Sequence, residues 1–231
     1  MTAAVSSCPE AREALDCFGS RTLYGCVQPP HSEFSVTVTG AVQTGLDIYE
    51  EYSADPMTAA LFKAQTPLTA PGPALLAYRR ELALTGGSYD KALGIMAALH
   101  GGLTYAPGAT TVRETAENAL AQGQGVCQDY AHIMLSLLRL EGIPCRYAAG
   151  MTLGEGASHA WVEALCNGYW YGFDPTNGLL VDENYIRVSC GRDAGDCAVI
   201  RGTFRGLASQ VQSEFVTVTH CDSSTSAASR R

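Results

Sequence analysis

The sequence predicts an α+β fold in which a helical part is followed by an antiparallel sheet, with a small β appendage at the N-terminus. Three observations predict this class. From Asp55-Pro56 onward the chain is Ala-rich and helical in pattern. Later, two runs rich in aromatic and β-branched residues flank Asn167-Gly168, which is the strongest short-range signal for a β-hairpin. Near the start, Phe34 to Thr39 alternates apolar and polar side chains and ends at Gly40, as a half-buried strand does.

These patterns divide the chain into three parts. We expect residues 1–50 to form the short β appendage, residues 51–221 the main domain, and residues 222–231 a Ser-rich, disordered tail. Glu214 to Thr219 alternates in the same way as Phe34 to Thr39, so we expect the two segments to pair or to share one small sheet. The alternative is that one of them is an exposed edge strand through which the protein forms a homodimer.

Breaks in the helical pattern separate the expected helices, which cover the segments 57–64, 74–84, 90–100 and 115–121. Pro71 to Pro73 interrupts the pattern between the first two. Asp90 can cap the third helix, and Gly101-Gly102 closes it. Thr111 to Glu114 is expected to form a capping box at the start of the fourth.

Cys127 is expected to open a further helix. It follows Gly125, and the apolar-rich segment Ala131 to Leu140 ends before Gly142 and Pro144, which stop a helix. A thiol in a first helical turn lies near unpaired backbone N–H groups and the positive end of the helix dipole, which favour the thiolate. Cys127 is therefore a candidate nucleophile, although position alone is equally consistent with a small buried hydrophobic residue.

The two-residue turn of the predicted hairpin sets the register of its strands. If Cys166 faces Tyr169, counting back along both strands places Trp161 opposite Asp174. His159 shares the face of these two side chains because strand residues alternate with period two. His159 and Asp174 are then diagonal neighbours about 7 Å apart at Cβ, and the carboxylate can orient the imidazole. A slip of one residue would put Asp174 on the opposite face.

Cys127, His159 and Asp174 together supply a nucleophile, a base and an orienting acid. The imidazole takes the thiol proton or holds the thiolate as an ion pair, and it later protonates a leaving amine. The carboxylate fixes the imidazole tautomer and stabilises its charged form. A developing oxyanion needs at least two donors, of which the backbone N–H of Cys127 is one. The side chain of Gln122 or Gln124 could be the second, and either is equally plausible as a solvated loop residue.

The motifs around these residues read Gly-Val-Cys-Gln-Asp-Tyr-Ala, Ser-His-Ala-Trp-Val-Glu and Phe-Asp-Pro-Thr-Asn-Gly. In order and spacing they resemble the transglutaminase-like superfamily, specifically its bacterial transglutaminase-like cysteine proteases. The resemblance covers residues 55–205 and includes the C-terminal pattern around Tyr185. It implies a papain-like α+β core, the transglutaminase-core cysteine proteinase fold, with Cys127 as nucleophile, His159 as base and Asp174 as orienting acid. The β appendage would be a remnant of the β region that often precedes this core.

We therefore expect cysteine-dependent acyl transfer on peptide or isopeptide amides through a thioester, with hydrolysis by water as the main outcome. The expected partner is a peptide or protein substrate, and this chemistry requires no cofactor and no metal. Two alternatives stay open: transglutaminase cross-linking of glutamine to an amine, and a catalytically silent binding or scaffold domain. The short N-terminal β region favours the scaffold, whereas the intact set of Cys127, His159 and Asp174 argues against it.

Composition makes several other classes of function unexpected. With 15 basic and 23 acidic residues the formal charge is −8, so we do not expect a nucleic-acid surface. No apolar run approaches the ~20 residues that span a bilayer, and Met1 to Leu15 lacks the apolar centre of a signal peptide. We therefore expect no membrane contact and a cytoplasmic location. The nine cysteines are widely spaced, and reduced thiols in a reducing compartment explain them more simply than a zinc site.

Three other polar residues near the motifs are expected to have supporting roles. His132 lies five residues after Cys127, about 140° around a helix, so we expect a core histidine and not the base. Asp129 should stabilise the helix N-terminus, with its side chain turned away from the thiol. Glu163 shares a face with His159 but lies about 13 Å along the strand, which makes Asp174 the better orienting acid.

Overall fold

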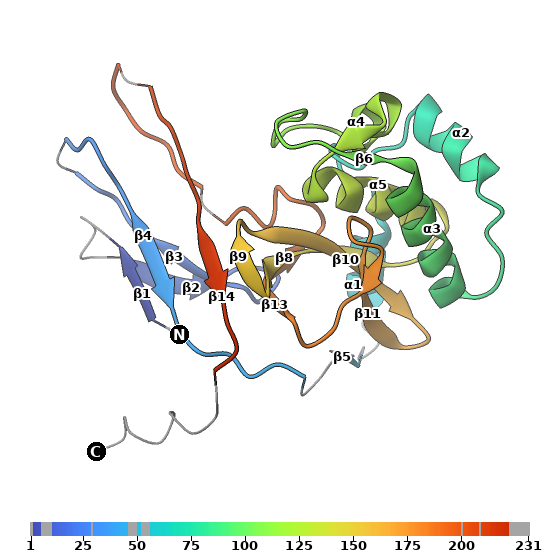
Figure 1. Ribbon diagram of the computed structural model, residues 1–231, viewed down its shortest axis with the longest axis horizontal. Coiled ribbons are helices and arrows are strands. Elements are labelled where there is room, and N and C mark those ends of the chain that lie inside the picture. The colour runs from blue at the N-terminus through green and yellow to red at the C-terminus, as the bar shows by residue number, and fades with distance from the viewer. Residues whose placement is uncertain are drawn as a thin grey trace.

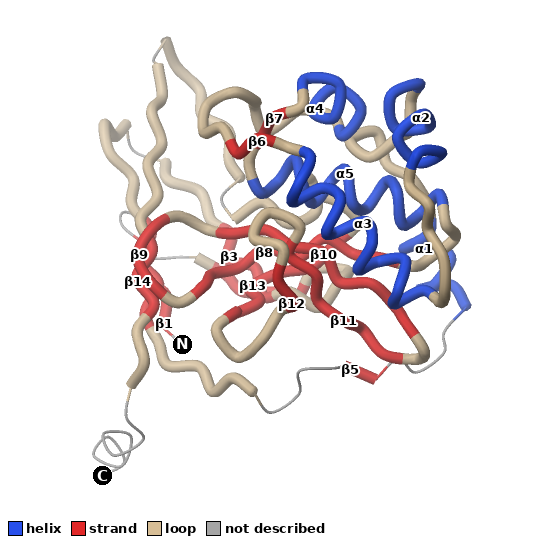
Figure 2. The backbone as a smooth tube through the Cα atoms, turned by 45° about the vertical axis from the view of Figure 1, so that its right-hand side comes forward, coloured by secondary structure: helices blue, strands red, loops and turns tan. Residues whose placement is uncertain are grey.

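The computed structural model describes residues 2–5, 11–28, 30–45, 50–51, 56–199, 201–207 and 209–221. In this part of the chain, helices come first in the main domain and an antiparallel sheet follows, which confirms the predicted α+β class (Figure 1). Figure 2 shows the helices gathered on one side and the strands of the main sheet on the other. The tail predicted for residues 222–231 lies outside the described residues.

The described helices are α1 (Pro56–Lys63), α2 (Pro73–Glu81), α3 (Ser88–Gly102), α4 (Ala116–Gln122) and α5 (Cys127–Leu140). The capping box predicted at Thr111 to Glu114 is wrong. Thr115 is the N-cap of α4, and its hydroxyl accepts a 3.3 Å hydrogen bond from the backbone N–H of Asn118. Asp90 accepts from the backbone N–H of Gly87, so it supports the first turn of α3 from inside the helix. No helix in these ranges is both long and apolar enough to cross a bilayer.

Helix α5 runs through the centre of the domain. All of its residues from Asp129 to Arg139 are buried, because α2, α3 and α4 contact it together with strands β8 (Cys145–Thr152) and β10 (His159–Cys166). Such a helix is apolar around most of its circumference. The one arginine in this stretch, Arg139, donates to Thr69 Oγ1 (2.7 Å) and to the backbone carbonyl of Arg192 (2.5 Å), which offsets the cost of burying its charge.

The main sheet has the strand order β12-β11-β10-β8-β13, and β5 also pairs with β11. Its remaining strands are β5 (Glu50–Glu51), β11 (Tyr169–Asp174), β12 (Leu179–Leu180) and β13 (Tyr185–Gly191). Strands β10 and β11 pair Cys166 with Tyr169 and keep that register as far as Phe173, so the predicted hairpin register is confirmed. The turn residues Asn167 (φ 53°) and Gly168 (φ 88°) both have the positive φ that a type I′ turn requires.

Sequence patterning did not predict β8 and β13, although they complete the sheet. Strand β8 is buried on both faces over most of its length and is rich in Ala and Gly, so it shows no alternation. At Gly150 the two strands approach closely: an added Cβ would lie 2.0 Å from the carbonyl oxygen of Ile186 and 2.7 Å from the ring of Trp161. The register of β13 shifts here, between Arg187 and Ser189. Only glycine fits this approach.

The small strands near the chain ends pair differently from the prediction. Strand β1 (Thr2–Val5) pairs with β4 (Val36–Thr39), whereas β14 (Val216–Val218) pairs with β9 (Gly154–Gly156). The prediction that the two Val-Thr segments pair with each other or share one sheet is therefore wrong. Strand β9 lies in the connection from β8 to β10, so β14 runs beside the segment that leads to His159 (Figure 1). Alternation identifies a strand but not its partner.

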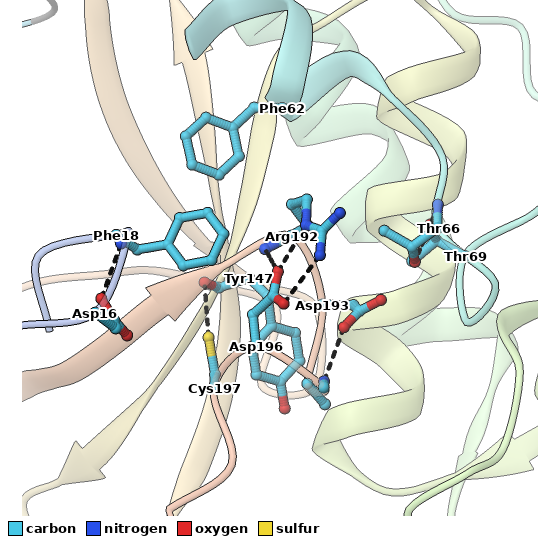
Figure 3. A network of polar contacts seen from close by, with 12 residues as sticks. Asp16, Phe18, Phe62, Thr66, Thr69, Tyr147, Arg192, Asp193, Asp196 and Cys197 are labelled. Atoms are coloured by element: carbon cyan, nitrogen blue, oxygen red, sulfur yellow. Dashed lines mark hydrogen bonds and ion pairs between the residues drawn. The ribbon is translucent and has the colours of Figure 1, made fainter. Parts of the chain in front are cut away.

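The other short strands are β2 (Arg12–Leu15), β3 (Arg21–Tyr24), β6 (Thr104–Tyr105) and β7 (Gln124–Gly125). Strands β2 and β3 form a hairpin whose turn packs on the main domain (Figure 3). Phe18 in this turn lies beside Phe62 of α1, with ring centroids 6.0 Å apart, and Phe62 meets Trp170 of β11 edge-on at 5.6 Å. In the same view the Arg192 guanidinium binds the Asp196 carboxylate (2.8 Å) and fastens the segment after β13.

Candidate active site

Cys127 is the first residue of α5 and is partly exposed. Val126 precedes it as the N-cap, and the backbone N–H of Val126 donates to Asp129 Oδ2 (2.8 Å). The same oxygen accepts from Thr110 Oγ1 at 2.6 Å. Burial raises the pKa of Asp129, and these two hydrogen bonds oppose the rise. Asp129 therefore stabilises the helix N-terminus, as predicted, and the unpaired N–H groups of the first turn lie at the thiol.

Tyr105 comes to Cys127 through a short parallel strand pair. Strand β7 leads into Cys127, and β6 lies beside it with Tyr105 opposite Gly125. The backbone N–H of Ala106 donates to the carbonyl of Gly125 at 2.9 Å, which fixes this pairing. Burial is the main cause that raises the pKa of Tyr105, and the neighbouring Cys127 is the second. No pattern in the sequence predicted this neighbour, because β6 is too short to show a period.

His159 begins β10 and Asp174 ends β11, and the hairpin register brings the two side chains together. His159 Nε2 donates to Asp174 Oδ2 at 2.7 Å, so the predicted diagonal neighbours are in contact. The Asp174 side chain is fully buried, and that of His159 is 14% exposed. Because Nε2 is engaged by the carboxylate, Nδ1 is the ring nitrogen that remains for the thiol.

The imidazole of His159 is strongly biased towards its charged form. Burial on its own lowers the pKa of His159, but hydrogen bonds and opposite charges from Asp174 and Cys127 outweigh that effect and raise the pKa to about 9. The interaction with Cys127 brings all three predicted side chains into one cluster. An imidazolium held by an ionised, buried carboxylate beside the thiol is the charge distribution that these shifts favour for His159 and Asp174.

Asp174 is held by five hydrogen bonds. Its Oδ2 accepts from His159, from Asn177 Nδ2 (2.7 Å) and from the hydroxyl of Tyr185 (2.8 Å). Its Oδ1 accepts from the backbone N–H groups of Thr176 (3.0 Å) and Asn177 (3.1 Å). Burial raises the pKa of this carboxyl, and the donors, led by His159, more than compensate, so the pKa lies below its ordinary value. Asp174 is therefore an ionised, immobile acceptor.

Several side chains near the site did not stand out in the sequence. Gln122 and Gln124 are both exposed, and strand pairing places Tyr105 opposite Gly125, two residues before the thiol. Reasoning from the residues also missed the contacts of Asn177 and Tyr185 with Asp174. A signal for Asn177 was present, since an Asx turn places the residues two and three positions after an aspartate against its carboxylate. Tyr185 comes from β13, and nothing local points to it.

The remaining predicted side chains lie where they were expected. His132 is fully buried and accepts from the backbone N–H of Ala194 at 3.1 Å; burial lowers its pKa to about 4 against the opposing charge of Asp193. It is a neutral core histidine. Glu163 forms ion pairs with Arg146 of β8 (2.6 Å) and with Arg187 of β13 (2.7 Å), so its carboxylate is engaged away from His159. Among the described residues no group of three or more His, Cys, Asp or Glu side chains is arranged to hold a metal ion.

Part of the chain is similar in sequence to mycobacterial proteins. An uncharacterized protein of Mycobacterium leprae is 44% identical over 114 residues, which cover 45% of this chain and 40% of the relative. An uncharacterized protein of Mycobacterium tuberculosis is 35% identical over 115 residues, covering 43% of this chain and 37% of the relative. The matched segment thus spans about two fifths of the length of these relatives.

Among solved structures, a candidate cysteine protease from Cytophaga hutchinsonii superposes with a TM-score of 0.69 and 23% identity, covering 86% of this chain and 72% of the other. This likeness shows the fold. The sequence profile of the transglutaminase-like superfamily matches residues 77–175. That segment holds α5 and the β10–β11 hairpin, and with them the whole cluster of thiol, imidazole and carboxylate. Residues 77–175 are therefore similar to the core of the transglutaminase-like superfamily.

Proposed function

We propose that the protein is a cysteine-dependent acyl-transfer enzyme that acts on amide bonds of peptides or proteins and passes the acyl group to water. The observation that carries this proposal is the His159–Asp174 hydrogen bond of 2.7 Å beside a cysteine in the first turn of a helix. A scaffold needs a packed core, but it has no physical need for an imidazole held between a thiol and a buried carboxylate.

In the first half-reaction the Cys127 sulfur attacks the carbonyl carbon of the amide. A C–S bond forms, and the carbonyl electron pair moves to oxygen. As that pair returns, the C–N bond breaks and the leaving amine takes the proton from His159. The products are a thioester on Cys127, a free amine and a neutral His159. Asp174 keeps the ring oriented throughout.

The developing oxyanion is stabilised by the backbone N–H of Cys127 and by the hydroxyl of Tyr105. The first donor is an unpaired N–H at the start of α5. The second donor, the Tyr105 hydroxyl, takes the place of Gln122 and Gln124 as the side-chain candidate. The β6–β7 pair holds Tyr105 next to the residues that precede the thiol. A phenol and a backbone amide on one oxyanion form a two-donor site.

In the second half-reaction His159 takes a proton from the acceptor, which attacks the thioester and releases Cys127. Water is the proposed acceptor, since Cys127 is partly exposed and Tyr105 is 54% exposed, so the thioester would be open to solvent. A transglutaminase would instead have to keep water away until an amine arrives. The proposed class is therefore a protease or amidase.

Alkylation kinetics test the nucleophile without knowledge of the substrate. Native protein would be treated with iodoacetamide near pH 7, and each cysteine would be followed by mass spectrometry. The exposed Cys17 and Cys221 serve as internal references. We expect Cys127 to react faster than both and to lose that advantage in His159→Ala, because the thiolate loses its counter-charge. Equal rates for Cys127 and the references would contradict the proposal.

The acceptor is tested with unfolded casein and a fluorescent primary amine. Hydrolysis gives cleavage products, or ammonia without incorporated amine. Cross-linking activity gives ammonia together with fluorescent casein. Cys127→Ala, which removes only the sulfur, is the matched control for both readouts.

A further inference from the structure

One carboxylate oxygen of the candidate site accepts hydrogen bonds from three donors, which is more than it can bind equally strongly. Asp174 Oδ2 lies 2.7 Å from His159 Nε2, 2.7 Å from Asn177 Nδ2 and 2.8 Å from the Tyr185 hydroxyl. A carboxylate oxygen offers about two lone-pair sites, so three short hydrogen bonds must divide its electron density. The imidazole therefore shares its acceptor with two competitors.

The carboxylate cannot relieve this competition by turning. Its other oxygen accepts from two successive backbone N–H groups, those of Thr176 at 3.0 Å and Asn177 at 3.1 Å. These groups belong to the turn that follows β11, so rotating the carboxylate would break two hydrogen bonds in a fully buried place. Oδ2 is thus fixed in position against all three donors.

We propose that Tyr185 is a positioning residue of the acyl-transfer site: its hydroxyl competes with His159 for Asp174 Oδ2 and so limits how tightly the carboxylate retains the imidazole proton. This inference rests on the proposed function. The hydroxyl acts on His159 through Asp174 and does not touch the reacting atoms. Asn177 contributes a second competing donor to the same oxygen.

The hydroxyl and the ring of Tyr185 have separable roles. The ring packs edge-on against Trp161 with centroids 5.4 Å apart and lies 6.2 Å from the His159 ring, contacts that phenylalanine would keep. Burial and the charge of Asp174 raise the pKa of Tyr185 above its ordinary value. The hydroxyl therefore stays protonated and keeps donating across the whole pH range in which a cysteine enzyme works.

This competition matters because His159 must both hold a proton and release it. Its pKa is already raised to about 9 by its two partners. An acceptor that bound the imidazolium still more tightly would make His159 a poorer donor to the leaving amine. Further donors to Oδ2 stabilise its negative charge and so weaken its attraction for the imidazole proton.

The test compares native protein with Tyr185→Phe through the charge on His159. Iodoacetate is an anion and is attracted by an imidazolium beside the thiolate, whereas iodoacetamide is neutral. The ratio of their rates at Cys127, measured against pH, falls as His159 loses its proton. We expect the midpoint of that fall to move upward in Tyr185→Phe by about half a pH unit or more, and a smaller rise in Asn177→Ala.

Tyr169→Phe is the matched control, since Tyr169 lies at the far end of β11 from Asp174 and its variant should leave the midpoint unchanged. An NMR titration of the His159 ring in a Cys127→Ala background repeats the measurement without the thiol, and the same upward shift is expected. An unchanged or lower midpoint in Tyr185→Phe would overturn the inference. An unreactive Cys127 with an upward NMR shift would instead count against the proposed function and leave the role of Tyr185 standing.

Discussion

Raising the pH from about 6 to about 10 is expected to weaken the folded state through His159. Its pKa is about 9 in the folded protein and 6.5 in the absence of structure. A group whose pKa is raised by folding contributes stability that is fully present below the unfolded value. That stability is lost as the pH rises through the folded value, because the folded state then gives up a proton that the unfolded state has already released.

The size of the effect follows from the two pKa values. The difference between 6.5 and about 9 corresponds to about 3 kcal/mol of preference for the imidazolium in the folded state. Solvent screening reduces this little, since the His159 side chain is only 14% exposed and its partner carboxylate is fully buried. A domain of ordinary stability would lose a large fraction of its free energy of unfolding over this range.

Urea unfolding at a series of pH values measures the loss, with tryptophan fluorescence as the signal. Trp161 and Trp170 are 1% and 4% exposed, so both report on the main sheet. The free energy of unfolding of the native protein should fall more steeply between pH 6 and pH 10 than that of His159→Gln. The difference between the two proteins removes contributions from distant titrating groups.

A constant difference between native protein and His159→Gln across this range would refute the reasoning. It would mean that His159 titrates near its ordinary pKa, and that the contacts with Asp174 and Cys127 do not stabilise the imidazolium. Asp174→Asn provides a second check. Removing the carboxylate charge leaves only Cys127 to oppose the effect of burial on the pKa of His159, so the pH dependence should become shallower in this variant.

Three further predictions concern single side chains. Gly150→Ala should strongly lower the unfolding temperature, because the added Cβ would lie 2.0 Å from the carbonyl oxygen of Ile186. The added Cβ of Gly156→Ala would have no atom within 4 Å, so this control variant should have little effect. Asp129→Ala should lower the free energy of unfolding in urea by about 1–2 kcal/mol through loss of the α5 cap, and an unchanged midpoint would contradict that role. Tyr105→Phe should reduce kcat/KM for amide hydrolysis by about tenfold or more while leaving the alkylation rate of Cys127 unchanged; unaltered turnover would remove Tyr105 from the oxyanion site.

Local rules account for the part of the site that the sequence predicted. A two-residue turn with positive φ at Asn167 and Gly168 fixes which residues of β10 and β11 face each other, so the contact between His159 and Asp174 could be read from spacing. The helix that begins at Cys127 could also be predicted from local sequence, because its apolar segment and the residues that end it lie within one short stretch. Both depend on neighbours in the chain.

Only the tertiary structure decided the contacts between segments that lie far apart in the sequence. Two Val-Thr segments have the same alternation, yet β4 pairs with β1 and β14 with β9, since pairing depends on competition among all available strands. Strand β8 has no alternation because it is buried on both faces. Tyr105 and Tyr185 reach the site from β6 and β13, each placed by long-range pairing, and the burial that shapes the pKa of His159 exists only once the core has closed.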